Sequence, residues 1–438
     1  MIKILAVTDK ENTAIDRLAT GVAPYMNGYD YKVIAIHPKR PSQEDIAIFV
    51  QLASQADIID YHYFRTAEML RTHLPELKDK PSILRHFNPY SIEGDWSGYD
   101  YIVACNKSIE ADLKRGYKNV LFHPITRNPK NYTFREEATS HDTVLMVANR
   151  IEAKKGILEV AQACQELNVS FHLVGNISDP AYFAQVAACR TTTFSQDISD
   201  EALAKAYSEA TLHVCNSQDN FESGTMPILE AMFSGVPVLS RNVGHVPDLY
   251  NGENLILNPN EKEDVDALAK LIFKALADKK ALHDIAQKAW QTVKSYTDQR
   301  RAWLYKKLYR QMQSEETPVS VIVPTASDPR TLLACLVAIE NQTYKNIEII
   351  VADDGNEPDI KKLVDEFRGM TAKPVVYLNS FGDDYGLARA RNLGIIEATG
   401  DILVFDDQRQ VMHVEAIAEF VAHAAPKQWL YGNKGGKK

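Results

Sequence analysis

The 438 residues are enough for two to four domains, and the 45% that are apolar are ample for several packed cores. Lysine and arginine number 49 against 58 acidic residues, so the formal net charge of −9 argues against a protein that neutralises many phosphates of a nucleic acid. No apolar run approaches the roughly 20 residues of a membrane-spanning helix, and the start "MIKILAVTDKEN" turns polar too soon for a signal peptide.

Short β-branched runs, with helical-period segments between most of them, occupy the first part of the chain. These runs lie at residues 2–8, 31–37, 56–63, 82–87, 99–105 and 119–124. Strands that alternate with helices predict a parallel sheet covered by helices. We therefore expect an α/β domain over residues 1–126.

A polar stretch without periodicity, residues 126–142, predicts a domain boundary. A second series of strand-like runs follows it, at 143–149, 170–175, 191–196, 210–215, 237–240 and 254–259. It predicts a second Rossmann-like domain over residues 142–295. Two such halves would form a cleft between the carboxyl ends of their sheets, where doubly wound folds bind ligands.

A helical linker over residues 296–316 is expected to precede a third α/β series over residues 317–438. Its strand-like runs are 319–325, 347–355, 373–379 and 401–407. The linker contains "RRAWLYKKLYRQMQ", a basic and aromatic helix, for which two interpretations stand. It either touches an anionic membrane surface that carries a lipid-linked acceptor, or packs between domains, which we favour.

The stretch "NFESGTMPILEAMFSG", residues 220–235, concentrates the features of an anion site. Pro227 suits the first turn of a helix that would end at Gly235. Backbone N–H groups at such a helix start bind phosphate. The acids on either side of this turn, Glu222 and Glu230, would accept hydrogen bonds from sugar hydroxyls, unless they are merely solvated surface acids. The N–H groups expected to face the anion belong to Gly224, Thr225 and Met226.

This stretch resembles the glutamate-x7-glutamate signature of retaining GT-B glycosyltransferases of family GT4. The resemblance extends over roughly residues 1–295 and includes the "LEAM" run and the loop "VGHVPDLYNGEN". It implies a GT-B fold, with Glu222 orienting the transferred sugar and Glu230 binding the ribose of the donor.

The same family carries a basic pair after the first strand of its nucleotide half, and "VANRIEAKKG" matches it with Arg150 and Lys155. Breaking a sugar–phosphate bond develops negative charge on the leaving diphosphate, and fixed cations stabilise that charge. Lys154 is the expected bystander of this pair.

In the first half, "SILRHFNPYS" places His86 at a strand end, where members of the family often carry a histidine beside the donor sugar. Alternatively, His86 only makes hydrogen bonds within a loop. Arg85, Tyr61 and His62 are lesser candidates. The chain has "DKENTAIDR" where the family often has a Gly-Gly loop, so no residue there is assigned.

Residues 317 to about 425 resemble the nucleotide-binding half of GT-A enzymes of family GT2. Asp354 matches the acid that meets the nucleobase, and Arg391 matches the "ARN-x-G" element. Asp406, Asp407 and Gln408 stand where an Asp-x-Asp metal site is expected. Carboxylates hold Mg²⁺ or Mn²⁺ against a diphosphate, and Gln is a weaker ligand.

The acceptor half of that second family, with its general base, would lie beyond Lys438. We therefore expect a partial GT-A module, either cut from a longer two-enzyme polypeptide, which we favour, or a remnant that binds or scaffolds. An inverting transfer without a general base would be incomplete.

The sequence as a whole predicts a glycosyltransferase that moves a hexose from a UDP- or GDP-sugar to a glycan or lipid-linked glycan, with retention, in cell-surface polysaccharide synthesis. No metal is expected in the first module, and no nucleic acid among the partners. A sugar-nucleotide epimerase and a nucleotide-sugar-binding scaffold subunit remain alternatives. Five cysteines without C-x-x-C spacing favour a reducing cytoplasm, with peripheral contact at the inner face of the membrane as a further expectation.

Overall fold

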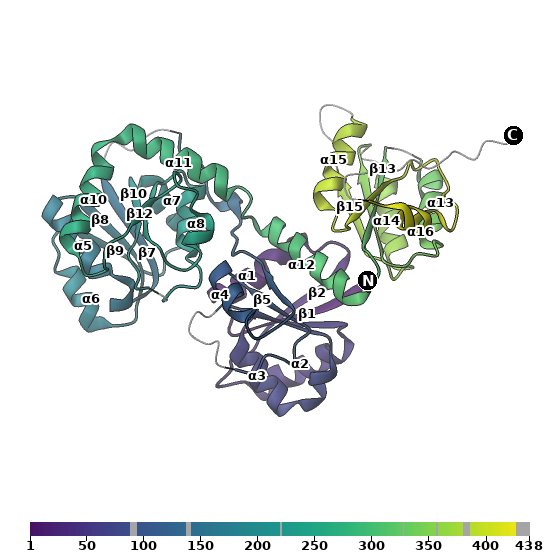
Figure 1. Cartoon of the computed structure of the whole chain (residues 1–438), viewed down its shortest axis with the longest axis horizontal. Helices are drawn as coiled ribbons and strands as arrows, with labels where there is room; N and C mark the ends of the chain where they lie inside the picture. The colour runs from purple at the N-terminus through teal and green to yellow at the C-terminus, as the bar shows by residue number, and fades with distance from the viewer. Residues whose placement is uncertain are drawn as a thin grey trace.

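The computed structural model describes residues 1–87, 94–136, 142–219, 221–326, 328–355, 358–379 and 386–425. The chain forms three lobes, each built around a sheet of parallel strands (Figure 1). The sequences of the buried strands are nearly continuously apolar because helices cover both faces of a parallel sheet. The predicted α/β architecture is confirmed.

The first lobe holds a sheet in the order β2-β1-β3-β4-β5-β6. Since β1 pairs with both β2 and β3, the strand order reverses at β1, and ligands of such folds bind outside the carboxyl ends at that point. The strands are β1 Ile2–Thr8, β2 Tyr29–Ala35, β3 Ile58–Tyr61, β4 Ser82–His86, β5 Tyr101–Ala104 and β6 Val120–Phe122. The α-helices are α1 Ala14–Val22, α2 Gln43–Gln55, α3 Phe64–His73 and α4 Lys107–Leu113.

The second lobe holds a sheet in the order β12-β11-β10-β7-β8-β9, which is the doubly wound order with its reversal between β7 and β10. The strands are β7 Thr143–Ile151, β8 Ser170–Ile177, β9 Thr192–Ser195, β10 Leu212–Cys215, β11 Val238–Arg241 and β12 Ile256–Asn258. The α-helices are α5 Ile157–Leu167, α6 Pro180–Ala187, α7 Asp200–Glu209, α8 Met226–Phe233, α9 Val246–Leu249, α10 Val265–Ala277 and α11 Lys279–Val293.

The third lobe is smaller, with the sheet order β15-β14-β13-β16. Its strands are β13 Val319–Thr325, β14 Ile347–Asp353, β15 Val375–Asn379 and β16 Ile402–Phe405. Its helices are α13 Pro329–Glu340, α14 Pro358–Arg368, α15 Leu387–Glu397 and α16 Ala416–His423.

The chain passes between the first two lobes twice, and the two passes are joined by hydrogen bonds. The N–H of Arg127 donates to the carbonyl of Tyr296 (3.0 Å), and the N–H of Asp298 donates to the carbonyl of Arg127 (3.3 Å). The hydroxyl of Thr126 adds a bond of 2.8 Å to the Asp298 carboxylate. We call this paired segment the crossing. It lies at the start of the proposed boundary 126–142, of which residues 137–141 are outside the described part of the chain.

The long helix α12, Asp298–Gln313, runs from the crossing along the first lobe to the third (Figure 1). Toward the first lobe it buries Tyr305 and Tyr309. The guanidinium carbon of Arg85 lies 3.3 Å from the centre of the Tyr305 ring, and the Tyr309 hydroxyl donates to Asp60 (2.5 Å).

Toward the third lobe, α12 uses its basic side chains. Arg310 donates to the Glu348 carboxylate and to the Val319 carbonyl, both at 2.9 Å, and Lys306 lies 3.1 Å from Glu397. Because these cations are buried in ion pairs, the helix is packed between lobes and does not present them to a membrane surface. Among the described residues, no helix has both the length and the apolar character needed to cross a membrane.

The third lobe rests against the amino-terminal edge of the first sheet. The terminal amino group of Met1 lies 3.4 Å from the carbonyl of Ala372, just before β15. Gly28, just before β2, has a positive φ of 87°, and a side chain there would meet the carbonyl of Val375 at 3.2 Å. A small residue is therefore required where the two sheets approach each other.

Candidate active site

A cleft of about 460 Å³ separates the first two lobes. Its second-lobe wall is made by the carboxyl ends of β7 and β10, together with the loop before α8. Its first-lobe wall includes Ala14 at the start of α1, Phe64 at the start of α3, and Arg85. The cleft thus lies at the strand-order reversal of the second sheet, as the sequence predicts.

Helix α8 begins and ends as its sequence dictates. Pro227 stands in the first turn, where a missing N–H costs nothing, and the chain turns out at Gly235, with a φ of +69°. The N–H of Val236 bonds to the carbonyl of Ala231 (2.9 Å), which closes the helix in a Schellman turn.

The helix start faces the cleft as a cradle of backbone N–H groups. Gly224, Thr225 and Met226 all line the cleft. Within the described residues, the N–H groups of these three have no hydrogen-bond acceptor. Donors at the positive end of a helix dipole are suited to an anion such as a diphosphate.

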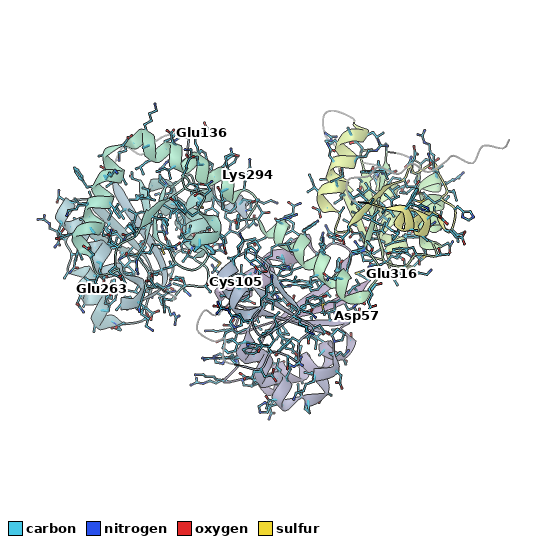
Figure 2. The ribbon with its side chains drawn as sticks, viewed as in Figure 1. Asp57, Cys105, Glu136, Glu263, Lys294 and Glu316 are labelled. Atoms are coloured by element: carbon cyan, nitrogen blue, oxygen red, sulfur yellow. The ribbon has the colours of Figure 1, made fainter. Side chains whose placement is uncertain are left out.

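Contacts from the first lobe hold this cradle in place. A Cβ atom on Gly224 would lie 1.9 Å from Cδ1 of Ile125, so any larger residue there would force Ile125 to move. The side-chain amide of Asn106 donates to the Ser223 carbonyl (2.8 Å). Cys105, labelled in Figure 2, lies beside it, with its sulfur 3.8 Å from the same carbonyl.

Lys155 and Glu222 meet across the floor of the cleft as a hydrogen-bonded ion pair. The carboxylate also accepts from the hydroxyl of Ser217 (2.8 Å), and the ammonium group lies 5.0 Å from the centre of the Phe221 ring. Lys155 ends a short 3-10 turn before Gly156, whose φ of +65° starts α5. The pair therefore brings one cation and one carboxylate to the same wall as the cradle.

Arg150 lies on the same wall but is held loosely. Its side chain is 65% exposed, and its closest acid, Glu152, is 3.6 Å away. It lines the cleft with Lys155, so both members of the predicted basic pair are there. A guanidinium without a tight partner is available to an anionic ligand.

The two histidines nearest the cradle are neutral at physiological pH. Burial lowers the pKa of His245 from 6.5 to about 4 and that of His213 to about 3. Nδ1 of His245 would lie 3.1 Å from a Cβ on Gly224, and its Nε2 lies 3.4 Å from the Thr225 hydroxyl. The positive charge of the second-lobe wall thus comes from Arg150 and Lys155.

Glu230 does not line the cleft in this structure. Its side chain is 3% exposed and accepts from Nε of Arg127 (2.6 Å) and from the Tyr207 hydroxyl (2.9 Å). Sequence analysis did not single out Arg127, which lies in the boundary segment without periodicity. An arginine in a polar linker is visible in the sequence. Its pairing with Glu230, which lies 103 positions away, is not.

His86 is also away from the cleft lining. It ends β4 completely buried, with its ring stacked on Phe64 at 6.2 Å and edge-on to Trp96 at 6.0 Å. Arg85, a lesser candidate, does line the cleft. Its guanidinium is bound to Asp60 (2.8 Å); burial opposes ionisation of this acid, but Arg85 lowers its pKa below the usual range.

In the third lobe, Asp354 follows β14 and is held from two sides. Its carboxylate accepts from the N–H of Gly386 (2.6 Å) and pairs with Arg389 (3.0 Å). The predicted Arg391 is instead exposed, with its guanidinium carbon 5.9 Å from the centre of the Phe405 ring. The run "LARARN" offers two arginines two positions apart, and the structure brings the first of them to Asp354.

The residues at the expected metal site do not form a ligand shell in this arrangement. The Cys335 thiol lies 3.3 Å from Asp406, whose pKa burial raises to about 6, Asp407 is paired with Arg409 (3.0 Å), and Gln408 accepts from a threonine hydroxyl. Within the described residues, no three His, Cys, Asp or Glu side chains are grouped to hold a metal ion. Asp406 and Asp407 are each bound to another side chain, and this arrangement fits Mg²⁺ poorly.

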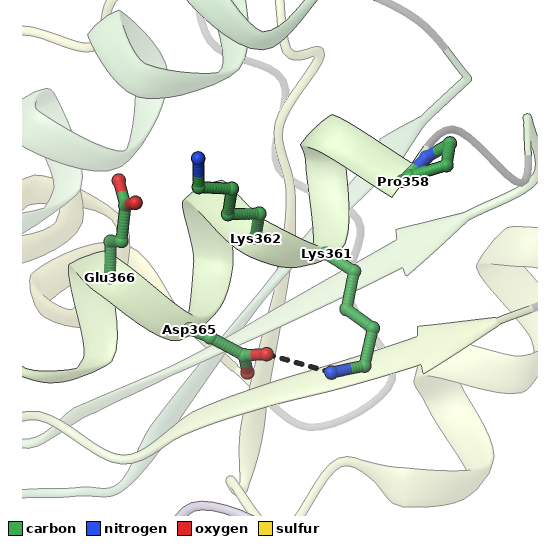
Figure 3. Close-up of a pocket in the computed structure, with 5 residues that line it drawn as sticks. All are labelled: Pro358, Lys361, Lys362, Asp365 and Glu366. Atoms are coloured by element: carbon green, nitrogen blue, oxygen red, sulfur yellow. Dashed lines mark hydrogen bonds and ion pairs between the residues drawn. The ribbon is translucent and has the colours of Figure 1, made fainter.

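A second hollow, of about 540 Å³, lies along the outer side of α14 (Figure 3). It is lined by side chains of a single helix, and the i,i+4 pair Lys361 and Asp365 spans part of it at 2.7 Å. Such pairs are ordinary features of a solvated helix surface. We assign no site there.

Two curated proteins of Streptococcus pneumoniae serotype 4 show similarity to part of this chain. Glycosyltransferase GlyA is 36% identical over 89 residues, which are 20% of this chain and 12% of that protein. Glycosyltransferase GlyG is 33% identical over 95 residues, which are 22% of this chain and 31% of that protein. The chain therefore covers well under two thirds of the length of either relative.

Two solved structures resemble a larger part of the chain. Anabaena Alr3699/HepE in complex with UDP-glucose matches with a TM-score of 0.59 and 16% identity, over 71% of this chain and 100% of that chain. Sucrose-phosphate synthase from Thermosynechococcus elongatus matches with a TM-score of 0.59 and 18% identity, over 72% of this chain and 100% of that chain. At these identities the likeness shows the fold.

Two protein families match separate parts of the chain. Residues 130–292 match the family described as Glycosyl transferases group 1, and residues 320–427 match Glycosyl transferase family 2. Together with the structural matches, this confirms the resemblance to a GT-B glycosyltransferase followed by a family 2 domain. The chain thus joins a domain of the group 1 glycosyl transferases to a domain of glycosyl transferase family 2.

Proposed function

We propose that the first two lobes form a glycosyltransferase that moves a hexose from a nucleotide diphosphate sugar to a glycan or lipid-linked glycan, with retention, in cell-surface polysaccharide synthesis. The observation that carries the proposal is the convergence of Arg150, Lys155 and Glu222 with the N–H groups of residues 224–226 in one cleft. The group 1 family match supports it.

The charges of the cleft suit a diphosphate leaving group. Two cations and a helix start lie on one wall, and Glu222 already neutralises Lys155 in part. As the bond between the anomeric carbon and the phosphate oxygen breaks, negative charge grows on the diphosphate. Groups fixed beforehand around that position stabilise it without reorganisation.

Glu222 is proposed to orient the transferred sugar. Its carboxylate is within the cleft and can accept from sugar hydroxyls beside its bonds to Lys155 and Ser217. Glu230 is proposed to bind the ribose after it exchanges its present partners. His86 is proposed beside the donor sugar, and this role would require its ring to turn from Phe64 and Trp96.

The transfer is proposed as a front-face displacement. The acceptor oxygen bonds to the anomeric carbon on the face that the diphosphate leaves, and the acceptor proton passes to a phosphate oxygen of the leaving group. No carboxylate is assigned as a covalent nucleophile. The reaction in this module is proposed to need no metal ion.

A UDP-sugar is the first donor to test, with GDP-sugars as the second class. The Anabaena structure was solved with UDP-glucose, and it matches 71% of this chain. The third lobe is proposed to bind a nucleotide at Asp354 as a partial inverting module. Mg²⁺ or Mn²⁺ at Asp406 and Asp407 would require both acids to turn from their present partners.

The test is transfer from a panel of radiolabelled UDP- and GDP-sugars, after thermal shift has shown which of them binds. Glu222→Ala is expected to abolish transfer while the nucleotide diphosphate still binds. Undiminished transfer by that variant would overturn the assignment. Consumption of donor without acceptor, followed by NMR, would instead favour an epimerase, and binding without turnover would favour a scaffold subunit.

A further inference from the structure

Arg127 is fixed at the crossing by its own backbone. Its N–H and its carbonyl are both bonded to the returning chain, at Tyr296 and Asp298. It also forms a parallel β-bridge with Thr297, the residue that caps α12. The position of Arg127 is therefore tied to the relation between the first two lobes.

The side chain of Arg127 reaches from the crossing into the second lobe. It is 18% exposed and donates to Glu230, one helical turn below the cradle residue Met226. Tyr207 donates to the other carboxylate oxygen, and its hydroxyl also lies 3.2 Å from the carbonyl of Pro227. Both oxygens of Glu230 thus accept from donors, Oε1 from the partly buried Arg127 and Oε2 from the buried Tyr207.

A ribose diol needs the same carboxylate lone pairs. A carboxylate offers about four acceptor directions. Nε and Nη2 of Arg127 both contact Oε1 of Glu230, and these charge-assisted bonds occupy that oxygen. The Glu230 side chain is only 3% exposed, so a sugar hydroxyl and Arg127 compete for its oxygens. Binding of ribose to this acid therefore requires an exchange of partners.

We propose that Arg127 is a positioning residue of the donor site, which holds Glu230 in the donor-free protein and yields it to the ribose when a nucleotide sugar binds. The inference rests on the proposed function. Because Arg127 belongs to the crossing, this exchange would release one side-chain tie between the lobes at the moment when the donor arrives.

The exchange has a measurable consequence for affinity. A ligand that must first break a bond in the protein binds more weakly by the cost of breaking it. Removing Arg127 removes that cost, but only for a ligand that uses Glu230. The gain should therefore depend on the ribose hydroxyls.

The experiment compares UDP with 2′,3′-dideoxy-UDP by calorimetry on the full chain, using GDP and its dideoxy counterpart if GDP binds more tightly. For Arg127→Gln we expect UDP to bind about 5- to 150-fold more tightly, the usual range of coupling between sites, and dideoxy-UDP to bind as it does to the wild type. Arg127→Gln should also unfold at a lower temperature.

Arg135→Gln is the matched control. Arg135 lies in the same connecting segment and donates to two backbone carbonyls, those of Ser208 (3.1 Å) and Ala210 (2.6 Å), but it touches no acid of the motif. Its loss should lower thermal stability without changing the ratio of the two affinities. The double variant Arg127→Gln, Glu230→Gln should lose the gain for UDP.

Two outcomes overturn the inference while the proposed function stands. One is equal weakening of both nucleotides in Arg127→Gln, which would make Arg127 a structural brace. The other is an Arg127→Gln protein that binds UDP no more tightly than the wild type does. Wild-type protein that binds no nucleotide sugar would overturn both proposals.

A measurement on the wild type keeps the test valid if Arg127→Gln does not fold. Hydrogen exchange at the amides of residues 125–128 and 296–298 should become faster with UDP and stay unchanged with dideoxy-UDP. Equal protection by both nucleotides would contradict the exchange of partners.

Discussion

The cleft between the first two lobes and the carboxyl end of the third sheet differ in what their polar groups are bound to. In the cleft, Arg150 is mostly exposed, and the cradle has N–H groups without acceptors among the described residues. In the third lobe, Asp354 is held by Arg389 and by a backbone N–H, and Asp407 is paired with Arg409. In the cleft, some donors of the motif thus remain available to a ligand, whereas the acids of the third lobe would first have to leave their present partners.

Removing one charge from each region tests most directly whether the two regions differ in function. Lys155→Gln should lower kcat for transfer by about 10²- to 10³-fold, the usual cost of losing one preorganised group at a developing anion. Asp354→Ala should leave that transfer unchanged. Steady-state kinetics with a UDP-sugar would check both.

Lys154→Gln is the control for the lysine variant, because Lys154 is the exposed neighbour of Lys155. It should keep nearly full activity. Equal losses in the two lysine variants would mean that general charge, and not the position of Lys155, supports transfer.

Acid should destabilise the cleft region through His245. Its pKa is about 4 in the folded chain against 6.5 for the free side chain, so the unfolded state binds more protons between these values. Stability is complete above pH 6.5 and falls as the pH drops toward 4, by about 3 kcal/mol in all. Thermal unfolding from pH 7.5 to 4.5 should show a smaller decline in His245→Gln; an identical decline would contradict this role.

The pKa of Asp406 predicts the opposite pH dependence of stability in the third lobe. Burial raises its pKa from 3.8 to about 6, so its contribution to stability is complete below pH 3.8 and is lost as the pH rises through 6. Asp406→Asn should therefore stabilise the chain at pH 7.5 by about 2 kcal/mol and have little effect at pH 4. Denaturant unfolding at the two pH values is the measurement. Destabilisation at pH 7.5 would show that the ionised carboxylate has a favourable partner.

The last prediction concerns the packing behind the cradle. Gly224→Ala would place a methyl group against Ile125, which should cost about 1–3 kcal/mol of stability and weaken nucleotide binding. Adding Ile125→Val should restore part of both losses, because it shortens the side chain that clashes. Calorimetry on the single and double variants would detect the rescue.

Sequence reasoning predicted the features that local patterns determine. Strand runs, the helix limits set by Pro227 and Gly235, and the meeting of Arg150, Lys155 and Glu222 followed from it. Parallel strands carry their carboxyl ends to one edge of a sheet, so residues after those strands must come together.

The sequence alone did not predict the partners that distant segments supply. Glu230 is bound by Arg127, and His86 is enclosed by Phe64 and Trp96. Which face of a helix or strand a side chain takes is encoded locally, but which side chain covers it depends on packing between segments far apart in the chain. The selection of Arg389 over Arg391 by Asp354 belongs to the same class.

The way the third lobe is attached also decides how the acids of its sheet are placed relative to the cleft. Helix α12 and Met1 contact the amino-terminal ends of the third sheet, while its acids lie at the opposite ends of the strands. The cleft likewise lies at the far, carboxyl end of the first sheet. With strands of seven residues, each about 23 Å long, the two sites would open on opposite sides of the molecule. If both sites act as proposed, a short sugar chain extended in the cleft would have to leave the protein before the third lobe could bind it.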